Sequence, residues 1–155
     1  MSRLYMIYHS ETGHTHVLAE LLAEGAQGVK GIEVKLVSAD EVDYVEAARA
    51  DGYAVGSPDY FNYVAGSIKT FFDRILYDER FKGKPYVGFS SHAGGGDVLT
   101  CIDSLARTCG LRRVGPGIAT PGRPDDDDAV KARQLGQALA EAAKEISAPK
   151  AGPRR

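Results

Sequence analysis

The chain has 155 residues, of which 43% are hydrophobic and 26% are charged, and its formal net charge is -2. This length suits one compact domain, and the near-neutral charge gives no electrostatic basis for binding nucleic acid or an anionic membrane. No apolar run is long enough to span a bilayer, and the N-terminus lacks the features of a signal peptide. We therefore expect a cytoplasmic protein with no nucleic-acid or membrane partner.

Short β-rich runs alternate with helical segments, which predicts parallel strands joined by right-handed crossovers. Strands are expected at residues 3–8, 32–37, 52–56 and 86–90, and within 113–119, where Gly115-Pro116-Gly117 interrupts the last one. Helices are expected from about residue 15 to before 28, and at 42–50, 65–76, 97–109 and 127–146. The sequence therefore predicts an α/β protein with a three-layer, doubly wound, five-stranded parallel sheet.

One domain over residues 1–147 is expected, followed by a disordered tail at 148–155 with proline, glycine and basic residues. The run Asp125 to Asp128 suits the first turn of the last helix, where the dipole favours carboxylates. Cys101 and Cys109 lie in one helical pattern at a separation of roughly 12 Å, too far for a mutual disulfide. We interpret both as small buried residues.

The residues after the first strand have the composition of a phosphate cradle. They are Ser10, Glu11, Thr12, Gly13, His14 and Thr15. The hydroxyls can donate to a phosphate, the glycine lets successive N–H groups face one anion, and the helix N-terminus adds further donors. The segment has no lysine or arginine, and neither the triphosphate-loop nor the dinucleotide fingerprint follows the first strand. A plain helix cap is the alternative interpretation.

Together with two later loops, this segment resembles flavodoxins. Ser-Glu-Thr-Gly-His-Thr is similar to their Thr-x-Thr-Gly-x-Thr phosphate loop. Residues 57–66, Ser-Pro-Asp-Tyr-Phe-Asn-Tyr-Val-Ala-Gly, resemble a segment of flavodoxin-like NAD(P)H:quinone reductases of the tryptophan-repressor-binding-protein type, and residues 90–97 are similar to their glycine-rich flavin loop. The resemblance covers about residues 3–146 and implies a flavodoxin-like fold, strand order 2-1-3-4-5, with flavin mononucleotide (FMN) as cofactor.

The resemblance also assigns flavin contacts to the two later loops. The residues concerned are Ser57, Pro58, Asp59, Tyr60, Phe61 and Asn62, and then Ser91, His92, Gly94, Gly95, Gly96 and Asp97. Pro58 stiffens its loop, Tyr60 and Phe61 are candidates for an aromatic wall along the isoalloxazine ring, and the glycines let the backbone approach the flavin edge. The alternatives are core packing for the aromatics and a flexible connector for the glycines.

Some residues depart from the family pattern. The chain has no tryptophan, so one face of the ring is either open or covered by a partner subunit in a homo-oligomer. Asp59 stands where the family often has threonine, and its charge disfavours an anionic flavin. Asn62 replaces a glycine and tolerates positive φ less well.

Three other classes of site fail on their residues. His9, His14 and His16 are clustered, but no cysteine or carboxylate set completes a metal shell, and we expect no metal. A receiver domain needs acidic residues after the first strand, an aspartate ending the third and a lysine ending the fifth, and these places hold Tyr8-His9-Ser10, Gly56-Ser57 and Ala119-Thr120. No cysteine lies in the phosphate loop, which excludes low-molecular-weight phosphatases.

Three functions remain open. The first is a flavoenzyme that takes hydride from NAD(P)H and reduces a quinone or similar small acceptor. The second is an electron-transfer protein that docks to a protein donor and a protein acceptor, and the third is an interaction domain without a cofactor. Near-neutral charge and an unshielded ring face favour the enzyme, whereas the short chain counts against it. No residue is singled out as catalytic.

Overall fold

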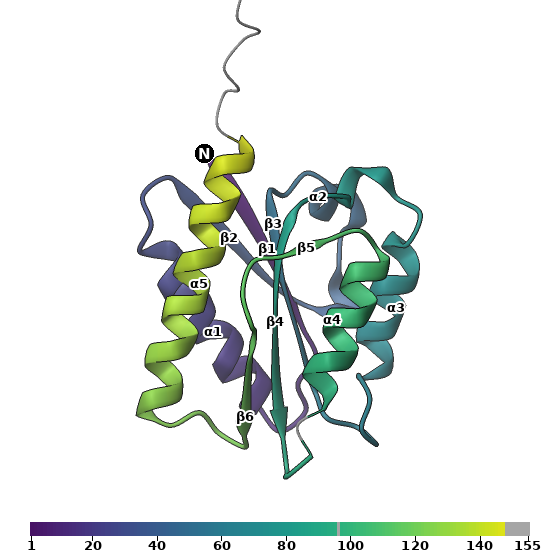
Figure 1. Ribbon diagram of the computed structural model, residues 1–155, viewed down its shortest axis with the longest axis vertical. Helices are drawn as coiled ribbons and strands as arrows, with labels where there is room; N and C mark the ends of the chain where they lie inside the picture. Colours follow the sequence, from purple (N-terminus) through teal and green to yellow (C-terminus); the bar gives the residue numbers. More distant parts are fainter. Residues whose placement is uncertain (96, 148–155) are drawn as a thin grey trace, which may run out of the picture.

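The computed structural model describes residues 1–95 and 97–147, and in it a parallel sheet lies between two layers of helices (Figure 1). The strands are β1 (Ser2–Tyr8), β2 (Ile32–Ser38), β3 (Gly52–Pro58), β4 (Pro85–His92), β5 (Arg112–Arg113) and β6 (Ile118–Pro121). The helices are α1 (His14–Gln27), α2 (Tyr44–Ala48), α3 (Gly66–Ile75), α4 (Val98–Thr108) and α5 (Asp126–Ser147), with 3-10 turns at Ala39–Glu41 and Glu79–Phe81. The tail at 148–155 lies outside the described residues.

The sheet has the predicted order, β2-β1-β3-β4-β5, and every pair in it is parallel. The fifth position is shared by two pieces, because β5 pairs with the start of β4 and β6 pairs with its end. The predicted interruption at Gly115-Pro116-Gly117 separates them. A Cβ at Gly117 would lie 2.2 Å from the carbonyl oxygen of Gly88, so only glycine lets the chain pass this close to β4.

Alternate residues of the central strands supply two separate cores. Leu4 and Met6 of β1 face the layer formed by α1 and α5, whereas Tyr5 and Ile7 face the layer of α2, α3 and α4. All four are buried, which is why the strand reads as a nearly continuous apolar run. In Figure 1 the two layers lie on opposite sides of the sheet.

Helices α1 and α5 pack with their backbones in close contact. A Cβ at Gly25 would lie 1.9 Å from the carbonyl oxygen of Arg133, and a Cβ at Gly136 would lie 1.9 Å from that of Leu22. Each helix therefore presents a glycine to the other helix's backbone. The contact fixes the position of α1, and with it the loop that precedes this helix.

Some predicted boundaries were wrong. The helix expected at 42–50 is shorter, α2 at Tyr44–Ala48, because the Asp43 side chain accepts hydrogen bonds from the N–H groups of Val45 and Glu46 and so caps the start of the helix there. Strands β3 and β4 continue past the predicted ends at 56 and 90, since Pro58 pairs with Ser91. A proline is tolerated there because it sits at the last strand position.

Candidate functional site

The phosphate loop joins the end of β1 to the start of α1. Gly13 precedes the helix with φ 95°, a left-handed conformation suited to glycine, and its N–H donates to Ser10 Oγ over 3.1 Å. No described side chain caps the N-terminus of α1. The first N–H groups of a helix have no partner inside the helix. The first N–H groups of α1 can therefore donate hydrogen bonds to an anion that binds at this loop.

The hydroxyls of the phosphate loop have different surroundings. Thr12 is exposed at the loop surface. Thr15 is buried, and its Oγ1 lies 2.7 Å from Ser91 Oγ, so these two hydroxyls bond to each other across α1 and β4. Ser10 already accepts a hydrogen bond within the loop. Thr12 is thus the hydroxyl best placed to meet a ligand, while Ser10 and Thr15 hold the loop in shape.

The loop after β3 forms a tight hairpin. The N–H groups of Tyr60 and Tyr63 each donate to the other residue's carbonyl over 3.0 Å, and the two residues between them, Phe61 and Asn62, have φ 57° and 61°. These dihedrals match a type I′ turn. Asp59 Oδ1 accepts from the Asn62 N–H over 2.8 Å. The hairpin is therefore held by its own backbone and by Asp59.

The two predicted wall aromatics differ in burial. Phe61 is fully exposed at the hairpin tip. Tyr60 is half-buried and packs against the core, and burial is the first cause that raises the pKa of its phenol.

At the base of this loop, Ser57 Oγ accepts from the Ala65 N–H and donates to the carbonyl of Pro58, each over 2.8 Å.

The loop after β4 approaches the hairpin closely. The Gly94 N–H donates to His92 Nδ1 over 3.1 Å, and Gly94 has φ 133°. A Cβ at Gly95 would lie 2.6 Å from Asp59 Oδ2, so the glycine makes the contact between the two loops possible. Gly96 lies outside the described residues.

These loops surround an open cavity of about 440 Å³ at the carboxyl ends of the strands. Its lining consists of Thr12, His14, Pro58, Asp59, Ser91, His92, Ala93, Pro121 and Gly122. The predicted residues that do not line it are Ser10, Glu11, Gly13, Thr15, Ser57, Tyr60, Phe61, Asn62, Gly94, Gly95 and Asp97. Three predicted loops thus meet at one cavity, although only some of their side chains face it.

The segment after β6 is a fourth wall that sequence reasoning missed. Gly122 has φ 82°, its N–H donates to the carbonyl of His92 over 2.9 Å, and the ring of His14 lies beside it. The Thr120 hydroxyl donates to the carbonyl of Gly122 and closes the turn. The sequence contains a signal for this wall. Pro121 and Gly122 stand at the end of the last strand, and the ends of parallel strands lie at the same edge of a sheet.

The sequence profile of the flavodoxin family matches residues 6–145. The chain belongs to the flavodoxin family. A flavodoxin of Aquifex aeolicus is 40% identical over 109 residues, which cover 68% of this chain and 59% of that protein, so the chain spans less than two thirds of it. An NAD(P)H dehydrogenase (quinone) of Archaeoglobus fulgidus is 28% identical over 94% of this chain and 100% of its own length. A solved archaeal flavodoxin superposes with TM-score 0.86 and 26% identity over 92% of this chain and 99% of that one.

The flavodoxin family binds FMN, and the cavity fits that cofactor. Its volume lies within the range of roughly 300–1,000 Å³ usual for ligand sites. The uncapped start of α1 offers N–H donors for a phosphate. A Cβ at Gly13 would meet no atom within 4 Å, so open space lies over the cradle. The residues present therefore suit a nucleotide with one phosphate group, and the redox function of the family applies to this chain.

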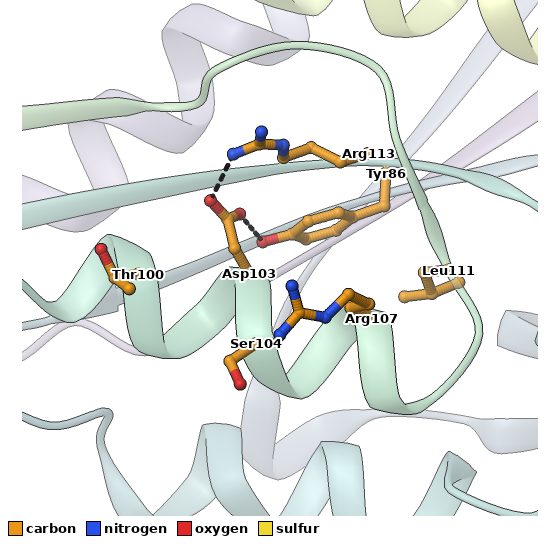
Figure 2. A pocket seen from close by; sticks show the side chains of 7 residues that line it. All are labelled: Tyr86, Thr100, Asp103, Ser104, Arg107, Leu111 and Arg113. Atoms are coloured by element: carbon orange, nitrogen blue, oxygen red, sulfur yellow. Dashed lines mark hydrogen bonds and ion pairs between the residues drawn. The ribbon is translucent and has the colours of Figure 1, made fainter.

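A second cavity of about 470 Å³ lies elsewhere on this protein (Figure 2). Its lining consists of Tyr86, Thr100, Asp103, Ser104, Arg107, Leu111 and Arg113. Asp103 accepts from the Tyr86 hydroxyl over 2.9 Å and from Arg113 over 3.1 Å, as the dashed lines in Figure 2 show. Asp103 and Arg113 are thus paired with each other, and no residue of the family's flavin loops lines this cavity.

Two further findings bear on the earlier expectations. Within residues 1–95 and 97–147 no group of three or more histidine, cysteine or acidic side chains could hold a metal ion. No helix in the described part of the chain is long and apolar enough to cross a membrane.

Proposed function

We propose that this flavodoxin-family protein is an NAD(P)H-dependent reductase of quinones or similar small acceptors. The observation that carries the proposal is the cavity wall made by the last two residues of β4 and the residue that follows them. The cavity residues there are Ser91, His92 and Ala93, and no large aromatic side chain stands among them. A flavin in the cavity would therefore keep one ring face accessible to a second small molecule. The match to a quinone dehydrogenase over that relative's full length supports the same proposal.

The residues of the cavity divide into two tasks. The first-turn N–H groups of α1 and the Thr12 hydroxyl hold the phosphate, and the helix dipole favours its negative charge. Pro58 and Asp59 form a stiff wall on the side of β3, while His92 and the backbone of Gly122 form the opposite side. When bound, FMN supplies the hydride and electron chemistry. The protein positions the ring and leaves a path to it.

Asp59 adds an electrostatic constraint to the cavity. Its carboxylate accepts a hydrogen bond from the Asn62 N–H and lies close to Gly95, which keeps its charge at the edge of the cavity. A fixed negative charge opposes the development of further negative charge beside it. We infer that Asp59 lowers the tendency of a bound ligand to become anionic in this cavity.

The deciding experiment follows the visible spectrum of the FMN-loaded protein during anaerobic addition of NADH or NADPH. The reductase proposal expects the flavin absorbance to bleach rapidly and to recover when a benzoquinone is added. Rapid reduction would require that the nicotinamide reaches the ring without another protein. Reduction only after addition of a separate flavoprotein reductase would contradict the proposal.

An electron-transfer protein that docks to redox partners is the second candidate. Two observations favour it: the 40% identity to the Aquifex aeolicus flavodoxin, and the archaeal flavodoxin that this chain covers over 99% of its length. In that case the open ring face would serve a protein donor and a protein acceptor. The spectral experiment above separates the two candidates, because a docking protein responds slowly to NAD(P)H alone.

We further propose a cytoplasmic location and a homo-oligomeric assembly. The unbridged thiols of Cys101 and Cys109 support the location, since reducing compartments keep cysteines free. Sedimentation of the FMN-loaded protein tests the oligomer. A monomer at all concentrations would contradict it.

A further inference from the structure

His9 directly follows β1 and contacts three separate segments around the cavity. Its Nδ1 lies 2.7 Å from Ser67 Oγ in α3, and its Nε2 lies 3.5 Å from Glu11 Oε1 in the phosphate loop. The imidazole also packs edge-on against Tyr60 with ring centroids 5.7 Å apart. Nε2 is buried and has no hydrogen-bond partner among the described residues. One half-buried ring thus connects the phosphate loop, the hairpin and α3.

Ser67 and Glu11, on opposite sides of the imidazole, together favour one tautomer of His9. A serine hydroxyl can donate to Nδ1, which leaves the imidazole proton on Nε2. This arrangement points an N–H toward the Glu11 carboxylate, whereas the other tautomer would place a lone pair against a negative charge. At 3.5 Å the contact is an electrostatic attraction rather than a hydrogen bond. Ser67 therefore orients the ring, and the ring attracts Glu11.

Glu11 is the one residue of the phosphate loop with a negatively charged side chain, and this charge repels a bound phosphate. The loop contains no lysine or arginine that could offset this carboxylate. Two negative charges within several ångströms repel each other, and little separates them at the protein surface except water. The side chain of Glu11 is mostly exposed, with a relative accessibility of 72%, so packing alone does not fix it.

The position of Glu11 in the structure is on the His9 side. Glu11 does not line the cavity, although Thr12 next to it does. After burial, the charge of Glu11 is the next cause that raises the pKa of Tyr60, which places the carboxylate toward the hairpin. The attraction of His9 acts in that same direction.

We infer that His9 is a positioning residue that holds the Glu11 carboxylate away from the phosphate cradle, and thereby favours flavins that carry a phosphate. The inference rests on the proposed FMN site. It concerns the discrimination between FMN and riboflavin, which differ only in that phosphate group. His9 itself does not line the cavity and acts through Glu11.

The test measures the dissociation constants of FMN and riboflavin, by quenching of flavin fluorescence, for the flavin-free full-length protein and three variants. His9→Asn keeps an amide near the Nδ1 position but removes Nε2. We expect it to weaken FMN binding roughly three- to tenfold and riboflavin binding less than about twofold. Glu11→Gln should bind FMN at least as tightly as the wild type. The double variant should match Glu11→Gln, because His9 matters only while Glu11 is charged.

A matched control exists on α1. His16 Nε2 lies 3.6 Å from Glu20 Oε1, a pair of the same kind outside the cavity lining. Glu20→Gln breaks this pair beyond the first turn of α1 and should leave the ratio of FMN to riboflavin affinity unchanged. Ser67→Ala provides a second route to the same effect if His9→Asn does not fold, since it removes only the hydroxyl that orients the ring.

The outcomes separate this inference from the proposed function. Equal affinity of the wild type for FMN and riboflavin would contradict the phosphate cradle itself. A wild-type preference for FMN, combined with an equal loss of both ligands in His9→Asn, would overturn only the inference about His9. Failure of Glu11→Gln to restore FMN binding in the double variant would overturn it as well.

Discussion

Gly13 combines a left-handed backbone with open space around its α-carbon. Its φ is 95°, and a Cβ there would meet nothing within 4 Å. Gly31 has φ 83° and equally free surroundings, but it lies in the turn before β2. The two positions therefore share a conformational requirement and differ in their distance from the cradle.

We predict that Gly13→Ala and Gly31→Ala each lower the free energy of unfolding by about 1–2 kcal/mol, the cost of a left-handed non-glycine residue. Only Gly13→Ala should also weaken FMN binding, because it changes the direction of the N–H groups that face the phosphate. Urea unfolding and FMN titration of both variants check this. A similar loss of FMN affinity in Gly31→Ala would show that the effect is global.

Phe61 occupies a left-handed turn position with its ring fully exposed. A bulky residue with positive φ is strained by about 1–3 kcal/mol. We predict that Phe61→Gly raises the melting temperature of the flavin-free protein. If Phe61 contacts the flavin ring, the same change will weaken FMN binding and increase the fluorescence of bound flavin. No change in either flavin signal would remove Phe61 from the predicted aromatic wall and leave Tyr60.

At the scale of elements, the contact between α1 and α5 depends on two glycines that face the opposite backbone. A Cβ at Gly136 would lie 1.9 Å from the Leu22 carbonyl oxygen, which no side-chain rearrangement can relieve. We predict that Gly136→Ala lowers the free energy of unfolding by about 1–3 kcal/mol despite the better helix propensity of alanine. The exposed neighbour Gln137→Ala is the control and should change stability little. Equal stability of both variants would show that α5 shifts without cost.

The elements themselves follow from local sequence, but some of their contacts do not. The alternation of Leu4 and Met6 with Tyr5 and Ile7 shows a strand buried on both faces, and Gly115-Pro116-Gly117 shows where the last strand breaks. The close approach at Gly25 and Gly136 could not be predicted, because it depends on how two helices far apart in sequence pack together. The extra length of β3 likewise depends on pairing with β4.

The candidate site likewise combines features that local sequence indicates with contacts that local sequence does not indicate. The three loops named by the resemblance meet at one cavity, and the predicted residues that line it are Thr12, His14, Pro58, Asp59, Ser91 and His92. Their contacts with FMN stay a prediction. The resemblance did not predict that Thr15 and Ser91 bond to each other, nor that His9 meets Ser67 from 58 residues away. Such pairings are set by the register of the whole sheet, which short motifs do not record.

At the scale of the whole molecule, a buried thiol links stability to pH. Burial raises the pKa of Cys109 from 9.0 to about 11. Between pH 9.0 and about 11, the Cys109 thiol therefore keeps its proton in the folded state and loses it in the unfolded state. The stabilisation is complete below pH 9.0 and is lost as the pH rises toward about 11.

We predict that Cys109→Ala reduces the loss of stability between pH 9.0 and about 11, although buried tyrosines such as Tyr86 keep part of the alkaline dependence. Urea midpoints of wild type and variant across this range provide the measurement. Parallel curves for the wild type and Cys109→Ala would contradict the prediction.

The packing of α5 on α1 also bears on the order in which the protein folds during translation. Leu18 and Leu22 of α1 belong to a core that is completed by Leu139, Ala140 and Ala143 of α5. Until the ribosome has released residues 126–147, this side of the nascent sheet is covered by α1 without α5, whereas the side packed by α2, α3 and α4 already has its partners. A nascent chain that stalls before α5 therefore exposes an apolar strip along α1, and this strip is where we expect chaperones to bind.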